Sequence, residues 1–231
     1  ETIRQPVGVC AAIVPFNFPA MVPFWFLPFA IACGNTFILK PSEQVPLTQQ
    51  IAFEILDGLD LPPGVVNVIT TSTSGKVSAP IIADPRLRKL SFTGSTEVGR
   101  KLLQQAAEGI LRTSMELGGN APFLIFEDAD LGAAVDGAML AKFRNIGQAC
   151  TAANRFIVHE AVADEFAARV TERVQAFKVG RGTEENVQIG PLINDDAVQK
   201  ANSLVRDATE RGAKVLTGGH PIDRPGTFYE P

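Results

Sequence analysis

The chain has 231 residues, 45% of them hydrophobic and 20% charged, and a formal net charge of −4. This length is enough to bury one large core or two small ones. The mildly acidic balance, without a basic stripe, disfavours nucleic acid as a partner, and no apolar run is long enough to cross a bilayer.

The most apolar run, at 22–34, contains Pro23 and Pro28, and we expect it to begin a buried helix rather than to anchor the chain in a membrane. The sequence opens without a basic leader or a cleavage site, and its three cysteines do not form a disulfide framework. We therefore expect a cytoplasmic protein in a reducing environment.

Apolar runs typical of buried strands alternate with helical patterns over the first half of the chain. The predicted strands lie at 7–14, 36–40, 65–70 and 88–93. The predicted helices lie at 46–59, 75–84 and 97–108. This alternation predicts an α/β fold built on a Rossmann-like parallel sheet.

The same rhythm continues in the second half. Strands are predicted at 111–117, 121–126, 154–159 and 213–218, and helices at 130–146, 160–177 and 195–211. The two glycines of "ELGGN" break the chain between these halves. We therefore expect one domain over 1–117 and a second over 118–231.

The stretch "FRNIGQACTAANR" raises the question of whether Cys150 is a nucleophile. Basic neighbours such as Arg144 and Arg155 favour the thiolate form of a cysteine. The alternative is a small apolar residue, which is the commoner role of a lone cysteine. Cys10 and Cys33 lie inside apolar segments and are assigned that inert, buried role.

A nucleophile needs partners, and two other residues qualify. Neither His159 nor His220 flanks an obvious catalytic turn, which disfavours a Cys-His hydrolase. Glu116 precedes two glycines and could accept a proton from water, although a surface charge at a strand end is the alternative. Asn17 in "PFNFP" is stiffened by its neighbours and could donate to an oxyanion, although an ordinary turn asparagine is the alternative.

Two further stretches indicate cofactor contacts. "LKPSE" ends a strand with Lys40 and Glu43, for which an ordinary solvated pair is the alternative. "FTGSTEVG" ends a strand with Gly94, Ser95 and Gly99 at a helix start, where free backbone N–H groups bind pyrophosphate. It does not match the usual dinucleotide fingerprint, so the motif by itself is a weak signal.

The motifs "PFNFP", "KPSE", "FTGSTEVG", "ELGGN" and "GQAC" together resemble the aldehyde dehydrogenase superfamily, in the family's order and over essentially the whole chain. "ELGGNAPFLIFEDADL", "KFRNIGQAC" and "IGPLIN" look most like the succinate-semialdehyde dehydrogenases. The opening segment from "PFNFP" to "KPSEQVP" looks more like the methylmalonate-semialdehyde dehydrogenases. The resemblance implies an NAD(P)-binding domain over 1–117 and the N-terminal part of a catalytic domain over 118–231.

The resemblance also implies a mechanism for oxidising an aldehyde to a carboxylic acid. Cys150 attacks the aldehyde carbonyl, and the Asn17 amide and the Cys150 backbone N–H hold the oxyanion. Hydride transfer to the nicotinamide leaves a thioester, which water activated by Glu116 hydrolyses. The CoA-dependent branch of the family typically lacks a glutamate at this position, so Glu116 favours hydrolysis over CoA transfer.

The implied cofactor is NAD, with NADP as the alternative, because the Glu43 carboxylate would repel a 2′-phosphate while Lys40 could partly offset that repulsion. No metal is implied. The residues that match cofactor contacts of the family are Pro15, Phe16, Lys40, Ser42, Glu43, Gly94, Ser95, Val98, Leu117 and Gly118.

The substrate position departs from the succinate-semialdehyde pattern. Arg144 matches an arginine that grips the substrate carboxylate in that subfamily, but its second arginine is replaced here by Trp25. The position of a second, redox-active cysteine in some of these enzymes is Ala152 in this chain. One cation remains where that subfamily has two, which weakens the case for succinic semialdehyde in particular, while a semialdehyde such as this one stays the expected substrate class.

Members of the family are longer than this chain, so we expect it to be an internal piece of a larger enzyme that forms a homodimer or homotetramer. Two other functions stay open on the sequence. One is a non-catalytic structural or binding use of the fold, and the other is a cysteine-dependent esterase. The joint presence of Cys150, Glu116 and Asn17 disfavours the first, and dependence on a nicotinamide separates the second.

Overall fold

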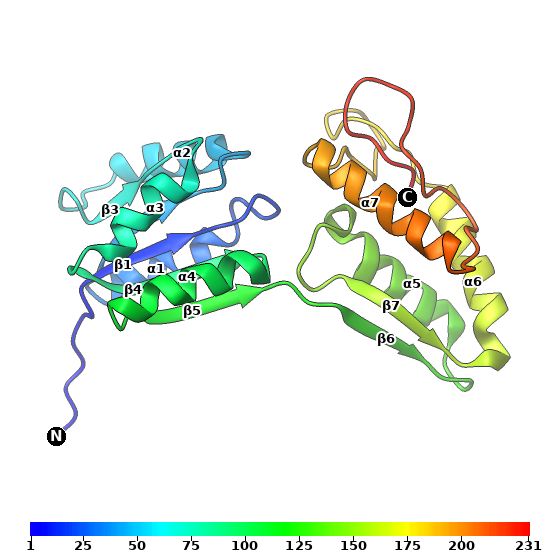
Figure 1. Ribbon diagram of the computed structural model, residues 1–231, viewed down its shortest axis with the longest axis horizontal. Coiled ribbons are helices and arrows are strands. Elements are labelled where there is room, and N and C mark those ends of the chain that lie inside the picture. Colours follow the sequence, from blue (N-terminus) through cyan, green and yellow to red (C-terminus); the bar gives the residue numbers. More distant parts are fainter. The chain divides into compact units, whose positions relative to one another are not determined.

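Two separate parallel sheets organise the chain, one in each of two units (Figure 1). The computed structural model describes all residues, Glu1–Pro231. The first unit comprises Glu1–Gly118 and the second Gly119–Pro231. No helix is both long and apolar enough to span a membrane.

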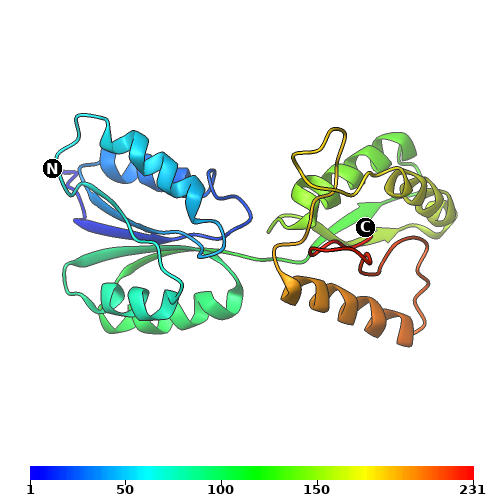
Figure 2. The same cartoon turned by 90° about the horizontal axis from the view of Figure 1, so that it is seen from above.

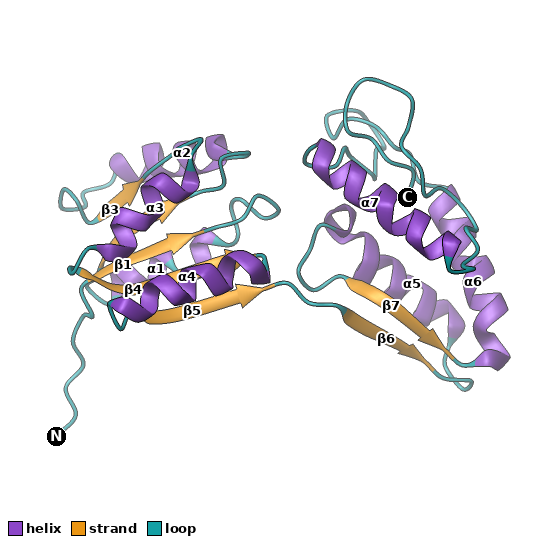
Figure 3. Cartoon of the chain, viewed as in Figure 1, coloured by secondary structure: helices purple, strands orange, loops and turns teal.

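The first unit alternates strands with helices, as Figure 3 shows by colour. Its strands are β1 (Val9–Ile13), β2 (Thr36–Lys40), β3 (Val66–Val68), β4 (Leu87–Gly94) and β5 (Arg112–Leu117). Its helices are the 3₁₀ turn η1 (Pro23–Trp25), α1 (Leu27–Ala32), α2 (Pro46–Asp57), α3 (Ser74–Ala83) and α4 (Thr96–Glu108). The predicted parallel α/β sheet is confirmed.

The strand order of this sheet is β3-β2-β1-β4-β5, and every neighbouring pair is parallel. The chain runs outward from β1 to β3 and then returns past β1 to form β4 and β5. Ile13 pairs with Lys40 on one side and with Phe92 on the other, so the strands end at a common edge. This order creates a topological switch point between β1 and β4.

Helices cover both faces of this sheet, as Figure 2 shows with α1 and α2 on one side and α3 and α4 on the other. Apolar residues of β1 and β2 pack with Val22 and Leu27 on the first face. Leu90 and Phe92 of β4 pack with helix residues such as Leu102 on the second. Each fully buried leucine or phenylalanine contributes about 1.5–3 kcal/mol to this core.

The second unit has a two-stranded parallel sheet with helices packed on it. Its elements are β6 (Ala121–Ile125), α5 (Leu131–Phe143), the 3₁₀ segment η2 (Arg144–Gly147), β7 (Ala153–Val158), α6 (Glu160–Gln175) and α7 (Asp195–Glu210). The side chains of Asp130, His159 and Asn194 cap the starts of α5, α6 and α7 by accepting backbone N–H groups. The core of this unit includes Ile125 and Phe166.

Two predicted elements differ from the structure. The strand predicted at 213–218 does not form, because these largely exposed residues have no partner strand to pair with. The helix predicted at 130–146 ends at Phe143, because the backbone turns left-handed at Asn145 and Ile146. A left-handed backbone cannot continue a right-handed helix.

The apolar run at 22–34 is only partly buried, so the prediction of a buried helix there is wrong in part. Val22 and Leu27 point into the core, whereas Trp25 is 40% exposed and Phe29 71% exposed. The expected burial is also wrong for Cys33, which is exposed beyond the end of α1, while Cys10 is buried as expected.

Candidate functional site

Several of the predicted site residues follow the carboxyl ends of the strands in the first unit. Pro15, Phe16 and Asn17 are half-buried and lie in the loop after β1, while Gly94 ends β4. β1 and β4 flank the switch point, which is where open α/β sheets bind their ligands. The topology therefore brings the "PFNFP" and "FTGSTEVG" motifs to one edge of the sheet.

A buried cation and a carboxylate meet at the end of β2. The Lys40 side chain is only 5% exposed, and its ammonium donates to Glu43 Oε2 at 3.0 Å. The Ser74 hydroxyl, at the start of α3, donates to the same oxygen at 2.7 Å. Lys40 and Glu43 are thus a partly buried cluster with a third member, not an ordinary solvated pair. Ser42, beside them, accepts the Gln44 N–H at 3.3 Å.

The hydrogen bonds of this cluster set the charge of Glu43. Burial by itself would raise the pKa of Glu43, but its own backbone N–H, Ser74 and Lys40 outweigh that effect and lower the pKa to about 2. The carboxylate is therefore ionised throughout the physiological range. It is also 46% exposed, so a ligand can reach it.

The start of α4 offers backbone donors. Ser95 is the N-cap, and its hydroxyl oxygen accepts the Val98 N–H at 3.4 Å. The preceding amides of the first turn have no intrahelical partner and can bind an anion. The Glu97 side chain is 76% exposed and pairs with Lys101 at 2.7 Å, which offsets the charge it carries near this helix start.

The end of β5 carries three of the predicted residues. Leu117 pairs with Gly94 across the β4–β5 ladder and packs beneath α4. A Cβ on Gly99 would lie 2.6 Å from Leu117 Cδ2, so a side chain there would displace the end of the Leu117 side chain. Glu116 precedes Leu117 on the strand and is exposed, as is Gly118. Glu116 is thereby accessible to solvent.

Cys150 of the second unit is exposed and lies in a turn shortly after a left-handed stretch of backbone. The φ angles are 52° at Asn145, 52° at Ile146 and 78° at Gly147. A β-branched residue rarely adopts this conformation, so Ile146 carries about 1–3 kcal/mol of strain. Strain of this kind concentrates at functional sites, and here it lies four residues before the candidate nucleophile.

Hydrogen bonds fix the segment on both sides of Cys150. The Ala152 N–H donates to the Ala149 carbonyl oxygen at 3.1 Å and closes the turn. The Arg155 guanidinium donates to the Asn120 carbonyl oxygen at 3.3 and 3.1 Å, which ties β7 to the "ELGGN" segment. Arg155 thus makes a structural contact with the backbone. Arg144 lies on η2 and is an exposed residue.

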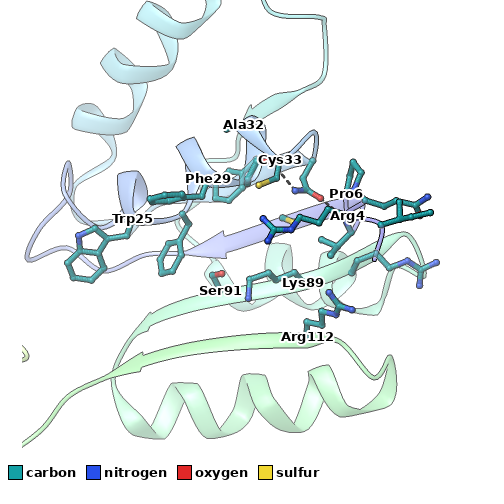
Figure 4. Close-up of a pocket in the computed structure, with 18 of the residues that line it drawn as sticks. Arg4, Pro6, Trp25, Phe29, Ala32, Cys33, Lys89, Ser91 and Arg112 are labelled. Atoms are coloured by element: carbon teal, nitrogen blue, oxygen red, sulfur yellow. Dashed lines mark hydrogen bonds between the residues drawn. The ribbon is translucent and has the colours of Figure 1, made fainter. Parts of the chain in front are cut away.

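Trp25 lines a large open pocket of the first unit, with a volume of about 1200 Å³ (Figure 4). Much of the remaining lining comes from the segment before β1 and from the first halves of β4 and β5, including Arg4, Lys89 and Arg112. This pocket therefore extends toward the amino ends of the strands, away from Lys40 and Glu43. No acidic residue lines it.

Ser74 was missed by reasoning from the sequence. A serine that begins a helix after a strand is a recognisable signal for a polar group at a ligand-binding edge. Its contact with Glu43 spans 31 residues, however, and only the parallel pairing of β2 with β3 reveals it.

Comparison with known proteins places these features in a family. The model of the aldehyde dehydrogenase family matches residues 1–231. The succinate-semialdehyde dehydrogenase of Paenarthrobacter nicotinovorans is 50% identical over 228 residues, which are 99% of this chain and 51% of the relative. The NADP(+) succinate-semialdehyde dehydrogenase of Escherichia coli is 46% identical over 99% of this chain and 47% of its own length.

A solved structure shows the same similarity at the level of the fold. A crystal structure of succinate-semialdehyde dehydrogenase from Burkholderia pseudomallei superimposes with a TM-score of 0.96 at 44% identity, covering 99% of this chain and 47% of that one. The chain therefore belongs to the aldehyde dehydrogenase family. It spans about half the length of the curated relatives it matches.

Proposed function

We propose that the protein containing this chain oxidises an aldehyde that carries an anionic group to the corresponding carboxylic acid, with NAD(P)⁺ as the oxidant. The observation that carries the proposal is the clustering of family motifs at the carboxyl ends of β1, β2, β4 and β5, together with a strained turn before an exposed cysteine. The relatives' names support an anionic substrate such as succinic semialdehyde.

The first unit is proposed to bind the dinucleotide. Its donor set fits this ligand, because Lys40 and Glu43 can bind the adenosine ribose hydroxyls and the first-turn amides of α4 can bind the pyrophosphate. When bound, the nicotinamide supplies a hydride acceptor. The Glu43 carboxylate disfavours a 2′-phosphate, so we infer a preference for NAD although the E. coli relative is named for NADP(+).

Cys150 is proposed as the nucleophile. Its thiolate sulfur forms a bond to the aldehyde carbon, and the carbonyl electron pair becomes an oxyanion. The Asn17 amide and the Cys150 backbone N–H are the proposed donors to that oxygen. As the oxyanion's electron pair re-forms the carbonyl bond, a hydride would leave the same carbon for NAD(P)⁺, and a thioester on Cys150 would remain.

Glu116 is proposed to complete the reaction. Its carboxylate accepts a proton from water, and the resulting hydroxide attacks the thioester carbon. The carbon–sulfur bond then breaks, which releases the carboxylic acid and returns the Cys150 thiolate. The exposure of Glu116 at the end of β5 supports this role, because the base must reach water.

Arg144 and Trp25 are proposed to determine which aldehyde the site binds. Arg144 is an exposed residue, and its cation can pair with the anionic end of a semialdehyde. Trp25 offers an apolar wall where the resemblance would place a second arginine. We infer that the affinity for a dicarboxylate-type semialdehyde is lower than in enzymes with two arginines.

A homodimer or homotetramer is the proposed assembly.

The test is a chimera in which these 231 residues replace the matching segment of the E. coli relative, so that every proposed catalytic residue comes from this chain. Reduction of NAD⁺ is followed with succinic semialdehyde, methylmalonic semialdehyde and an uncharged aliphatic aldehyde. Activity that disappears in Cys150→Ala supports the proposal. Aldehyde-independent ester hydrolysis without any NAD⁺ reduction would instead support an esterase.

A further inference from the structure

We propose that Ser74 is a positioning residue that holds Glu43 in place and thereby sets the preference for NAD over NADP. The inference rests on the proposed dinucleotide site. It adds a residue at the start of α3 that none of the sequence motifs includes. Its basis is the contact between the Ser74 hydroxyl and Glu43 Oε2 at 2.7 Å.

The two charged side chains of the cluster differ in burial. Lys40 ends a central strand of the sheet and is buried, so its ammonium is fixed. Glu43 lies in the loop after β2 with its side chain 46% exposed, and a glutamate that is free to rotate loses little by turning into water. A second donor at the start of α3 restricts the carboxylate to one orientation. Ser74 is that donor.

Ser74 is itself held in place. It is the first residue of α3, and its carbonyl oxygen accepts the Ser78 hydroxyl at 2.6 Å. Ser78 is buried at 8% exposure, so this bond anchors the helix start to the interior. The hydroxyl that binds Glu43 therefore comes from a rigid position.

A fixed carboxylate discriminates between the two nucleotides better than a mobile one. Held beside Lys40, it accepts hydrogen bonds from ribose hydroxyls and repels a 2′-phosphate. Released from Ser74, it can rotate away and leave the Lys40 ammonium to attract that phosphate. Loss of the Ser74 hydroxyl should therefore weaken NAD binding and strengthen NADP binding together.

The experiment measures NAD⁺ and NADP⁺ dissociation constants by calorimetry for the wild-type chain and for Ser74→Ala, Ser74→Thr and the control Ser72→Ala. Because Ser74 acts on the nucleotide only through Glu43, its loss should cost less than a direct hydrogen bond and raise the NAD⁺ dissociation constant about three- to tenfold in Ser74→Ala. Ser74→Thr keeps the hydroxyl, so its NAD⁺ dissociation constant should equal that of the wild type. Ser72→Ala, an exposed serine in the same loop, should change neither constant.

A double-mutant cycle and a spectroscopic signal make the test specific to Glu43. Adding Ser74→Ala to Glu43→Gln should have no further effect on either dissociation constant. Carboxyl NMR of the nucleotide-free protein should show the pKa of Glu43 rising from about 2 in Ser74→Ala, since one of its stabilising donors is gone.

The possible failures are distinguishable. A wild-type chain that binds neither nucleotide would contradict both the dinucleotide site and this inference. Wild-type binding that is unchanged in Ser74→Ala, or an unchanged Glu43 pKa, would overturn the role of Ser74 alone and leave the proposed function standing.

Discussion

The ammonium of Lys40 lies 3.0 Å from the carboxylate of Glu43, and the two side chains differ sharply in exposure, at 5% and 46%. A buried charge is costly unless it is paired, so Lys40 depends on Glu43 more than Glu43 depends on Lys40. The ionised Glu43 carboxylate can therefore accept hydrogen bonds from a ligand, while the Lys40 ammonium lies buried beside it. This arrangement underlies the first two predictions.

Glu43→Gln should relax the choice of nucleotide. The substitution keeps the size of the side chain and removes the charge that repels a 2′-phosphate, so the ratio of NADP⁺ to NAD⁺ dissociation constants should fall by about tenfold, equivalent to about 1.4 kcal/mol. Glu54→Gln on the exposed side of α2 is the matched control and should leave the ratio unchanged. An unchanged ratio in Glu43→Gln would remove Glu43 from the cofactor site.

Glu43 should also make the stability of the first unit sensitive to acid. Its pKa is about 2 in the folded chain, below the ordinary value of 4.5, so the unfolded chain binds the proton more readily. The stabilisation is complete above about pH 4.5 and is lost as the pH falls toward 2. Urea denaturation over this range should show the stability difference between the wild type and Glu43→Gln shrinking as the pH falls. A constant difference would contradict the assignment.

Gly99→Ala should destabilise the first unit. The new Cβ would lie 2.6 Å from Leu117 Cδ2 and 3.4 Å from the Phe92 ring, so the end of the Leu117 side chain must move away from its packed position, at a cost of about 1 kcal/mol. Gly75→Ala is the control, because a Cβ on Gly75, also within a helix, meets nothing within 4 Å. Chemical denaturation should therefore separate the two variants. Equal stabilities would show that the packing of α4 on β5 is loose.

Ile146→Gly should stabilise the second unit. Glycine adopts a φ of 52° without the steric cost that isoleucine incurs, so the free energy of unfolding should rise by about 1 kcal/mol. Leu140→Gly, on an exposed position of α5, should instead lower it by about 1 kcal/mol. If Ile146→Gly is destabilising, the turn before Cys150 is not strained.

The sequence patterns were most informative where local residues decide the structure. Alternating apolar strands and amphipathic helices indicate a parallel sheet, because each buried strand must be followed by a covering helix. The pattern at 213–218 is misleading because strand formation depends on a partner strand, which this segment lacks. The pattern at 130–146 fails at Ile146, since a β-branched residue gives no local signal for a left-handed turn.

The candidate site is likewise predictable from the sequence only where it depends on local motifs. The sequence motifs predict cofactor contacts for Lys40, Glu43 and Ser95 from the chemistry of their side chains and their positions at strand ends. The burial of Lys40 and the bond from Ser74 to Glu43 depend on strand order, which brings segments 31 residues apart to one edge of the sheet. The roles of Cys150, Glu116 and Asn17 stay predictions.

The proposed role of Cys150 is tested by the reduction of NAD⁺ by the chimera with succinic semialdehyde, measured by the absorbance of NADH for the wild type, Cys150→Ala and Cys33→Ala. Cys33 is also exposed and serves as the matched control. The proposed mechanism predicts NADH formation in the wild type and in Cys33→Ala and none in Cys150→Ala. NADH formation that persists in Cys150→Ala, or its absence from a folded wild-type chimera with every aldehyde tested, would contradict it.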